Sequence, residues 1–418
     1  MALSTFSNGL RLTVNEMPEL NTATVCINLV GGYQGEMALY NGMCELISRL
    51  ILCGTKTYPT KTELNRTAKQ NGLVVKTTCD VEFLQIEINC LKNKIDKAIE
   101  FAHDIIFNSN FDDKDIEAIK NQMKAEIELN KLNPAAYLSQ LTNQSMFART
   151  GLTNTKLGNA KSLDRITKEM LLEQLSRFVS PKNIVISVGG AVEYNTVLEL
   201  VNNSFYRTTR NYQYKQIKYV SQILDFEGFI NIKNRPYNQS RVQVSFLGLP
   251  YKSEDKYALN LIARPLENYL KKQLGAEPYY KSLSVYHTCY ANNGKLVFDI
   301  IVDSDSVERF MEKLLSEVKG VLNNRERLSG EFKAEKNAYI TEYVLNSEKA
   351  DSLVKLCANE LTLAKREYSL NNEFSSLADV TYEDAMDVLD DVIDYSKINI
   401  AYLGKPVKLE FLRDLILN

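Results

Sequence analysis

The sequence predicts an α+β protein built from two homologous domains, each a mostly antiparallel sheet with helices packed on one face. Three observations predict this class. Four segment pairs recur in the same order, 212 to 217 residues apart, along the 418-residue chain. Short alternating strands follow one another closely, and amphipathic helices separate the strand pairs. Strands joined by so few residues cannot form a parallel crossover, so they must pair antiparallel.

The internal repeat consists of matching strand and helix segments. The pairs are 25–31 with 242–248, 84–105 with 296–317, 163–179 with 377–393, and 182–189 with 397–404. In the third pair, Thr167 and Thr381 stand where a threonine caps the N-terminus of a helix. The fourth pair is a strand that closes on Gly189 in one half and Gly404 in the other. The chain therefore reads as a duplicated domain.

The sequence of each half predicts the same order of elements: two strands, a long helix, two more strands, several helices, and a final strand with its helix. Alternating or continuously apolar runs predict the strands of the first half at 9–14, 23–30, 74–79, 83–90 and 183–188. We expect domains at 1–206 and 221–418. The stretch 207–220 is polar, rich in tyrosine and without periodicity, so we expect a linker there.

Composition excludes several functional classes. Lys and Arg total 50 against 52 Asp and Glu, which leaves no basic excess for nucleic acid. No apolar run is long enough for a membrane span, and the first residues lack the pattern of a signal peptide, so we expect a cytoplasmic protein with no membrane partner. Seven scattered cysteines without C-x-x-C predict reduced thiols. His103 and His287, the two histidines of the sequence, are expected to be structural or surface residues.

Several segments resemble a known family. SNGLRL (7–12) and NGMCELISRLILCGTKTYP (41–59), followed by 111–138 and 157–190, are similar to the pitrilysin/insulinase family of inverzincin zinc metallopeptidases. The resemblance is to its processing-peptidase-like branch of about 400 residues. It extends along the whole chain and implies the same α+β fold.

The resemblance also implies that the zinc motif is degenerate. In the family, H-x-x-E-H on one helix supplies two zinc ligands and a general base, and a later helix supplies a glutamate ligand. Gly42 sets the register, which places Glu45 and Arg49 at the two histidines and Ser48 at the base. Glu126 matches the third ligand. We therefore expect no metal, cofactor or catalytic residue here, and zinc only in a partner subunit.

Two interpretations of these positions remain open. Cys44, Glu45 and Glu126 could form a rebuilt metal site, but Cys44 and Glu45 are adjacent on a helix and point about 100° apart. Alternatively, Arg49 pairs with Glu126 through a bidentate, partly buried salt bridge, and Ser48 is an ordinary helix residue.

A second family motif, R-E-x-x-G-x-x-Y, binds the substrate from the other half of the molecule. Gly275 sets its register here, so Lys271 replaces the arginine, and Tyr279 and Tyr280 follow the tyrosine position. The resemblance implies that Lys271 and a tyrosine contact a peptide substrate. The alternative is a solvated helix end and a loop packed by its aromatic rings.

Three functions are compatible with these observations. The first is a noncatalytic subunit of a heterodimeric peptidase, which forms half of a peptide-binding chamber with a homologous zinc-bearing partner. The second is a structural or peptide-binding protein without a peptidase partner. The third is an independent enzyme that uses unrecognised residues.

Overall fold

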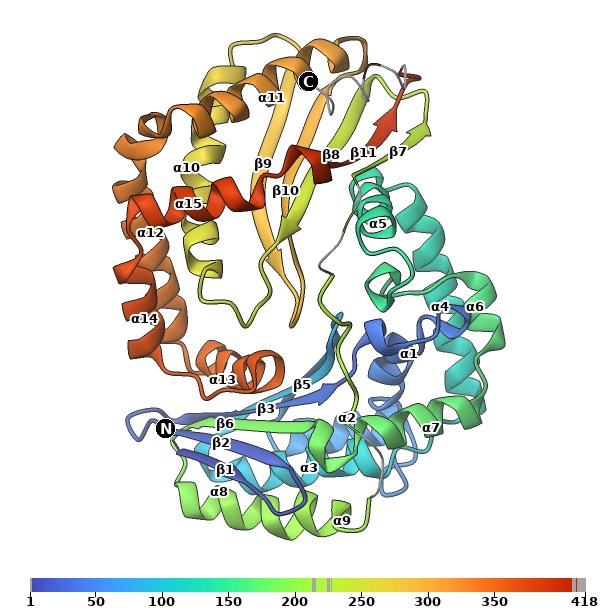
Figure 1. Cartoon of the computed structure of the whole chain (residues 1–418). Coiled ribbons are helices and arrows are strands. Elements are labelled where there is room, and N and C mark those ends of the chain that lie inside the picture. Colours follow the sequence, from blue (N-terminus) through green and yellow to red (C-terminus); the bar gives the residue numbers. More distant parts are fainter. Residues whose placement is uncertain (1, 213–215, 224–225, 227, 408–410, 412–418) are drawn as a thin grey trace. The chain divides into compact units, whose positions relative to one another are not determined.

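The computed structural model describes residues 2–212, 216–223, 226, 228–407 and 411. The chain forms two compact units, and each contains one sheet and its helices (Figure 1). Unit 1 comprises Met1–Leu129, Asn154–Val220 and Leu345–Tyr368, and unit 2 comprises Asn130–Thr153, Ser221–Val344 and Ser369–Asn418. The predicted two-domain α+β class is confirmed.

Unit 1 is organised around a six-stranded sheet in the order β1-β2-β6-β3-β5-β4. Its strands are β1 (Ala2–Thr5), β2 (Arg11–Glu16), β3 (Thr22–Val30), β4 (Val74–Cys79), β5 (Phe83–Leu91) and β6 (Ile184–Gly190). All neighbours are antiparallel except β2 and β6, which run parallel. The sequence predicted five of these strands. It missed β1, which is short and only half buried.

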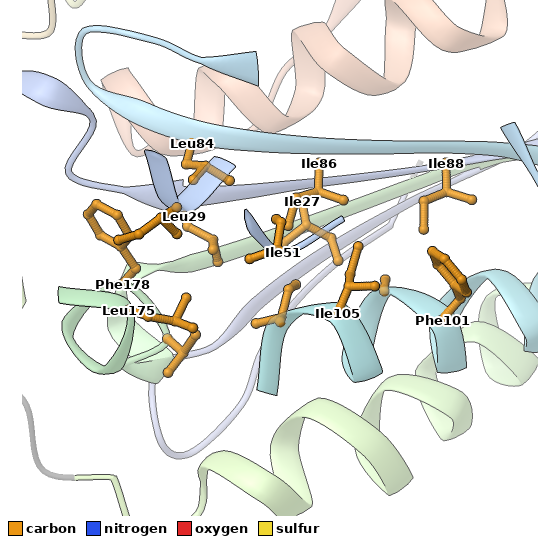
Figure 2. Packing of buried hydrophobic residues seen from close by; sticks show 14 of the residues in the cluster. Ile27, Leu29, Ile51, Leu84, Ile86, Ile88, Phe101, Ile105, Leu175 and Phe178 are labelled. Atoms are coloured by element: carbon orange, nitrogen blue, oxygen red, sulfur yellow. The ribbon is translucent and has the colours of Figure 1, made fainter. Parts of the chain in front are cut away.

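The helices of unit 1 bury the apolar face of this sheet. Within residues 43–209 they are α1 (Met43–Leu50), α2 (Lys61–Gln70), α3 (Ile95–Phe107), α4 (Asp113–Lys131), α6 (Ala160–Arg165), α7 (Lys168–Phe178), α8 (Tyr194–Val201) and α9 (Arg207–Thr209). Figure 2 shows Ile86 and Ile88 of β5 pointing toward Phe101 and Ile105 of α3. Thr167 caps α7, as predicted. This packed layer fixes the positions of α1 and α3 against the sheet.

Unit 2 repeats the plan with a five-stranded sheet in the order β7-β11-β8-β10-β9. Its strands are β7 (Phe229–Asn234), β8 (Gln239–Gly248), β9 (Tyr280–Cys289), β10 (Gly294–Asp303) and β11 (Asn399–Gly404). Its helices include α10 (Lys256–Leu274), α11 (Val307–Asn323), α14 (Leu370–Asp379) and α15 (Tyr382–Val392), while α12 spans Ser329–Ser347. Thr381 caps α15, as predicted. Among the described residues, no helix combines the length and apolarity needed to cross a membrane.

Each sheet also carries one helix from the other half of the sequence repeat. Helix α5 (Pro134–Met146) belongs to unit 2, where Thr142 Oγ1 donates to Gln243 Oε1 of β8 at 2.7 Å. Helix α13 (Ala350–Asn359) belongs to unit 1, where Asn28 Nδ2 of β3 donates to Asn359 Oδ1 at 3.0 Å. The predicted ranges 1–206, 207–220 and 221–418 follow the repeat along the chain. The compact units instead exchange one helical segment each.

The strand pairing shows that the last strands of the two halves, β6 and β11, match with a shift of one residue from the alignment predicted from the sequence. Strands β3 and β8 match at a separation of 217 residues, and each pairs with the last strand of its own half. The equivalent cross-strand pairs are Asn28 with Val185 and Ser245 with Asn399. Because Val185 therefore matches Asn399, Gly404 matches Gly190, and the expected match with Gly189 is wrong. A one-residue slip would turn every side chain of the strand to the opposite face.

Candidate functional site

The helix that carries the degenerate motif begins at a buried carboxylate. Glu36 accepts hydrogen bonds from the backbone N–H groups of Gly42 at 2.7 Å and Cys44 at 2.5 Å, and from Asn41 Nδ2 at 2.6 Å. Gly42 has φ 108°, and a Cβ there would lie 2.9 Å from the carbonyl oxygen of Leu157. A carboxylate at a helix N-terminus satisfies the free N–H groups and complements the helix dipole. These contacts hold the first turn of α1.

Burial raises the pKa of Glu36 to about 7, although its three hydrogen bonds act in the opposite direction. The side chain is buried in unit 1 between the loop and the start of α1. Its protonation therefore changes near neutral pH, at the helix that carries the motif positions.

One arginine joins the two carboxylates at the former ligand positions. Arg49 Nε donates to Glu45 Oε1 at 2.7 Å, and its two terminal nitrogens donate to the two oxygens of Glu126, each at 2.7 Å. The side chains of Arg49, Glu126 and Glu45 are 22%, 34% and 7% exposed. The predicted bidentate pair is confirmed, and it is partly buried. Positions 45, 49 and 126 thus converge on one point.

A second cation completes the charge balance of this cluster. Lys156 Nζ lies 3.5 Å from Glu45 Oε2. The pKa of Glu126 is lowered, mainly by its hydrogen bond from Arg49, and the same bond raises the pKa of Arg49. Sequence reasoning missed Lys156, because it lies in a loop outside the motif and no local pattern distinguishes it.

The residues present do not fit a zinc ion. Arginine keeps its proton at usable pH and has no lone pair to donate to a metal. Arg49 occupies the centre on which the ligand positions converge. Across the described residues, no group of three His, Cys, Asp or Glu side chains is placed to hold a metal. Cys44 is packed in the core of unit 1 with its pKa raised by burial, so the geometry does not favour the rebuilt Cys44–Glu45–Glu126 site.

Ser48 is a buried residue that connects α1 to the sheet edge. Its side chain lies in the interior of unit 1, and its carbonyl oxygen accepts a hydrogen bond from Thr77 Oγ1 of β4 at 2.9 Å. Strand β4 is the last strand of its sheet. Helix α1, which carries the charge cluster, is therefore hydrogen-bonded to an edge strand. Among the described residues, β4 pairs with a strand on one side only.

The second motif lies in unit 2, on α10 and the start of β9. Lys271 forms an ion pair with Glu267 and is 43% exposed. The other oxygen of Glu267 accepts the N–H of Val285 at 2.7 Å, which ties the pair to β9. Lys271 is thus held near the strand while its side chain remains accessible.

The two tyrosines behind Lys271 pack against one phenylalanine. Tyr279 is 6% exposed, with its ring 6.3 Å from that of Phe310 in an edge-to-face contact. Tyr280 is half buried and stacks on Phe310 at 6.4 Å. This packing fits the aromatic-loop alternative for both residues, and Lys271 is the more accessible of the three.

Comparison with protein families gives two matches that follow each other along the chain. Residues 12–160 match a model described as insulinase, peptidase family M16. Residues 165–339 match a model described as the peptidase M16 inactive domain. Together they extend from the first half of the sequence repeat into the second, as far as residue 339.

Curated relatives of the chain share low sequence identity. The β subunit of the mitochondrial-processing peptidase of Dictyostelium discoideum is 22% identical over 329 residues, or 75% of this chain and 70% of that protein. The non-peptidase homologue YmxG of Helicobacter pylori is 25% identical over 215 residues, or 51% and 48%. Subunit 1 of the bovine (Bos taurus) mitochondrial cytochrome b-c1 complex is 21% identical over 322 residues, or 74% and 67%.

A solved structure shares the fold over nearly the full length. The peptidase M16 inactive domain from Pseudomonas fluorescens superposes with a TM-score of 0.86 at 16% identity, covering 97% of this chain and 98% of that chain. At this identity, the similarity establishes the fold alone.

Proposed function

The chain belongs to the insulinase family, peptidase family M16, and from this premise we propose that it is the noncatalytic subunit of a two-chain zinc peptidase. It forms one half of a peptide-binding chamber, and a homologous subunit with an intact H-x-x-E-H motif carries the zinc. The observation that supports this most is the guanidinium of Arg49 between Glu45 and Glu126. The fold is retained, while the residues at the zinc-ligand positions bind one another through an internal ion pair.

We propose that the peptide binds along strand β4 of this subunit. It is an edge strand, and an extended peptide can add to such an edge through main-chain hydrogen bonds. Thr77 links β4 to Ser48 on α1, one residue before Arg49. A bound peptide would therefore run beside the charge cluster and meet no metal or general base there.

The relatives support an accessory role in a peptidase. One is named as a subunit of a processing peptidase, and another as a non-peptidase homologue. A cytoplasmic location is part of the same proposal.

The second candidate is a structural or peptide-binding role without a peptidase partner. The similarity to a subunit of the bovine cytochrome b-c1 complex favours it, since that protein is named as a subunit of a complex and not as a peptidase. The two candidates differ in whether a zinc-bearing chain depends on this one for activity.

The deciding experiment is reconstitution. This chain and an M16 homologue with intact H-x-x-E-H from the same genome should be purified separately, mixed, and assayed on a library of peptides. The mixture should cleave peptides that neither chain cleaves alone, and the two should co-elute. A homologue that cleaves equally well alone would refute the heterodimer and leave the second candidate.

A further inference from the structure

Unit 1 contains a pocket whose lining includes none of the motif positions and no residue of β4 itself. Its volume is about 360 Å³, at the lower end of the range for small-ligand sites. The lining residues come from α2 and the loops before and after it, from α3, and from the segment after α8: Thr57, Tyr58, Thr67, Asn71, Leu73, Lys97, Glu100, Phe101, His103, Asp104, Asn203, Ser204 and Thr208.

One wall of this pocket is an unusual backbone segment. Residues Asn202–Tyr206 form a π-helix, η6, and two of them, Asn203 and Ser204, line the pocket. A π-helix is rare, and such segments occur frequently at functional sites. The π-helix is therefore an observation independent of the pocket itself, and both indicate a functional site at the same position.

The charged groups of the pocket are already paired. Lys97 Nζ binds Glu100 at 2.8 Å. Asp104 accepts hydrogen bonds from the side chains of Thr55, Thr57 and Asn108 at 2.6, 2.9 and 2.8 Å. Because each of these charged groups already has hydrogen-bond partners, none is left to pair with an ionic ligand, and the desolvation of such a ligand would go uncompensated.

Neutral hydrogen-bonding groups dominate the rest of the lining. The hydroxyls and amides belong to Thr57, Tyr58, Thr67, Asn71, Asn203, Ser204 and Thr208, and the buried apolar side chains are Leu73 and Phe101. His103 shares a hydrogen bond with Thr208 at 2.7 Å. Such a surface matches a small ring with several hydroxyls on its edge and an apolar face.

We propose that this pocket binds an uncharged polyhydroxylated ring, such as a monosaccharide or the ribose of a nucleoside. Asn71 and Asn203, on different elements, supply amide contacts to the hydroxyls. Phe101 and Leu73 pack against the apolar face. The site is independent of the proposed peptide-binding role.

Saturation-transfer NMR on the full chain tests the proposal with D-glucose, D-ribose and uridine as separate probes. At least one should bind with a Kd of about 1 mM or tighter. Binding of ribose and uridine without glucose would identify a nucleoside sugar, and binding of glucose alone would identify a hexose. Absence of binding by all three at about 10 mM would overturn the proposal.

Variants show whether binding occurs in this pocket. Asn203→Ala and Thr208→Val alter exposed side chains, so the fold should persist, and each should weaken binding about threefold to tenfold, the effect of one lost hydrogen bond. Asn71→Ala tests the opposite wall in the same way. Asn202→Ala, in the same π-helix but outside the lining, is the matched control and should leave binding unchanged. Equal affinity in all four variants would place the ligand elsewhere and overturn the assignment.

Discussion

Arg49 and Glu126 are joined by two parallel hydrogen bonds of 2.7 Å between helices α1 and α4. The fork geometry of a guanidinium matches a carboxylate in this way, which a lysine cannot reproduce. A third N–H of the same group, on Nε, donates to Glu45. The pair therefore connects the two helices that hold the zinc ligands in catalytic relatives, and its contribution to stability is open to measurement.

Arg49→Ala should destabilise unit 1 by about 1–3 kcal/mol, between the ranges for exposed and buried ion pairs. The side chains are 22% and 34% exposed, so the loss should fall short of a fully buried pair. The chain has no tryptophan, so urea unfolding should be followed by circular dichroism. Arg177→Ala, which breaks the exposed i,i+4 pair with Glu173, is the control. Equal losses in the two variants would contradict a structural role for the Arg49 pair.

Glu36 should make stability depend on pH near neutrality. Its folded-state pKa of about 7 lies above the ordinary value of about 4.3. Between these values the folded chain holds a proton that the unfolded chain has released, so the contribution of Glu36 to stability falls as pH rises through this window. Above pH 7 the loss is complete, at about 3 kcal/mol or less.

Glu36→Gln removes this titration. Relative to the variant, the wild type should lose stability between pH 4.5 and 7 in urea titrations at each pH. Glu173→Gln, at an exposed position, controls for the loss of one carboxylate. If the wild type and Glu36→Gln curves run parallel across the window, the carboxyl group does not titrate there.

The convergence of positions 45, 49 and 126 makes a direct prediction about zinc. The wild type should bind no stoichiometric zinc, because Arg49 stays protonated. Glu45→His with Arg49→His restores two imidazoles at i and i+4, and Glu126 remains as the third ligand, so the double variant should retain about one zinc per chain. Elemental analysis after gel filtration measures it.

Adding Glu126→Ala to the double variant provides the control for that site. Loss of the third ligand should remove most of the bound zinc while circular dichroism shows an unchanged fold. Zinc retained by this triple variant, or by the wild type, would mean that the metal binds somewhere other than α1 and α4.

The exchanged helix α13 depends on polar contacts with the sheet of unit 1. Asn28, fully buried on β3, donates to Asn359 at 3.0 Å and to Thr362 at 3.1 Å. Asn28→Ala removes both of these hydrogen bonds and should cost about 1–3 kcal/mol. Hydrogen exchange should accelerate in 345–368 before it does in α3. Asn202→Ala, at an exposed position, is the control, and a uniform rise across unit 1 would argue against local release of α13.

Local patterns predicted the motif geometry well because helix periodicity determines it. Residues four apart on a helix share a face, so Glu45 and Arg49 had to be neighbours once their register was set. Thr167 and Thr381 cap their helices for an equally local reason. Such features need only a few adjacent residues, and the sequence contains them in full.

Tertiary features were harder to predict. Helices α5 and α13 have ordinary helical sequences, and nothing local shows that each packs on the sheet of the other half. The repeat register failed by one residue at Gly189, because every residue of β6 is buried and the strand lacks the alternation of buried and exposed positions that would fix it. Likewise, neighbouring Tyr279 and Tyr280 could not be told apart until the packing on Phe310 was known.

Lys271 provides the last prediction, which concerns the proposed partnership. If unit 2 contacts the peptide through the end of α10, the accessible Lys271 should contribute more to the cleavage rate than the buried ring of Tyr279. Lys271→Ala should lower the cleavage rate of the reconstituted pair by about threefold to tenfold, as expected for one solvent-accessible hydrogen bond of about 1 kcal/mol, and leave co-elution intact. Tyr279→Phe should have little effect, since that side chain is 6% exposed.

Lys272→Ala is the matched control for Lys271→Ala, because it removes an exposed lysine from the next position on the same helix. The comparison separates a specific contact from a general loss of positive charge. If Lys271→Ala and Lys272→Ala lower the rate equally, the lysine acts only through the surface potential. If neither lowers it, α10 does not reach the peptide, and the contribution of this chain to the chamber must come from unit 1 and its edge strand β4.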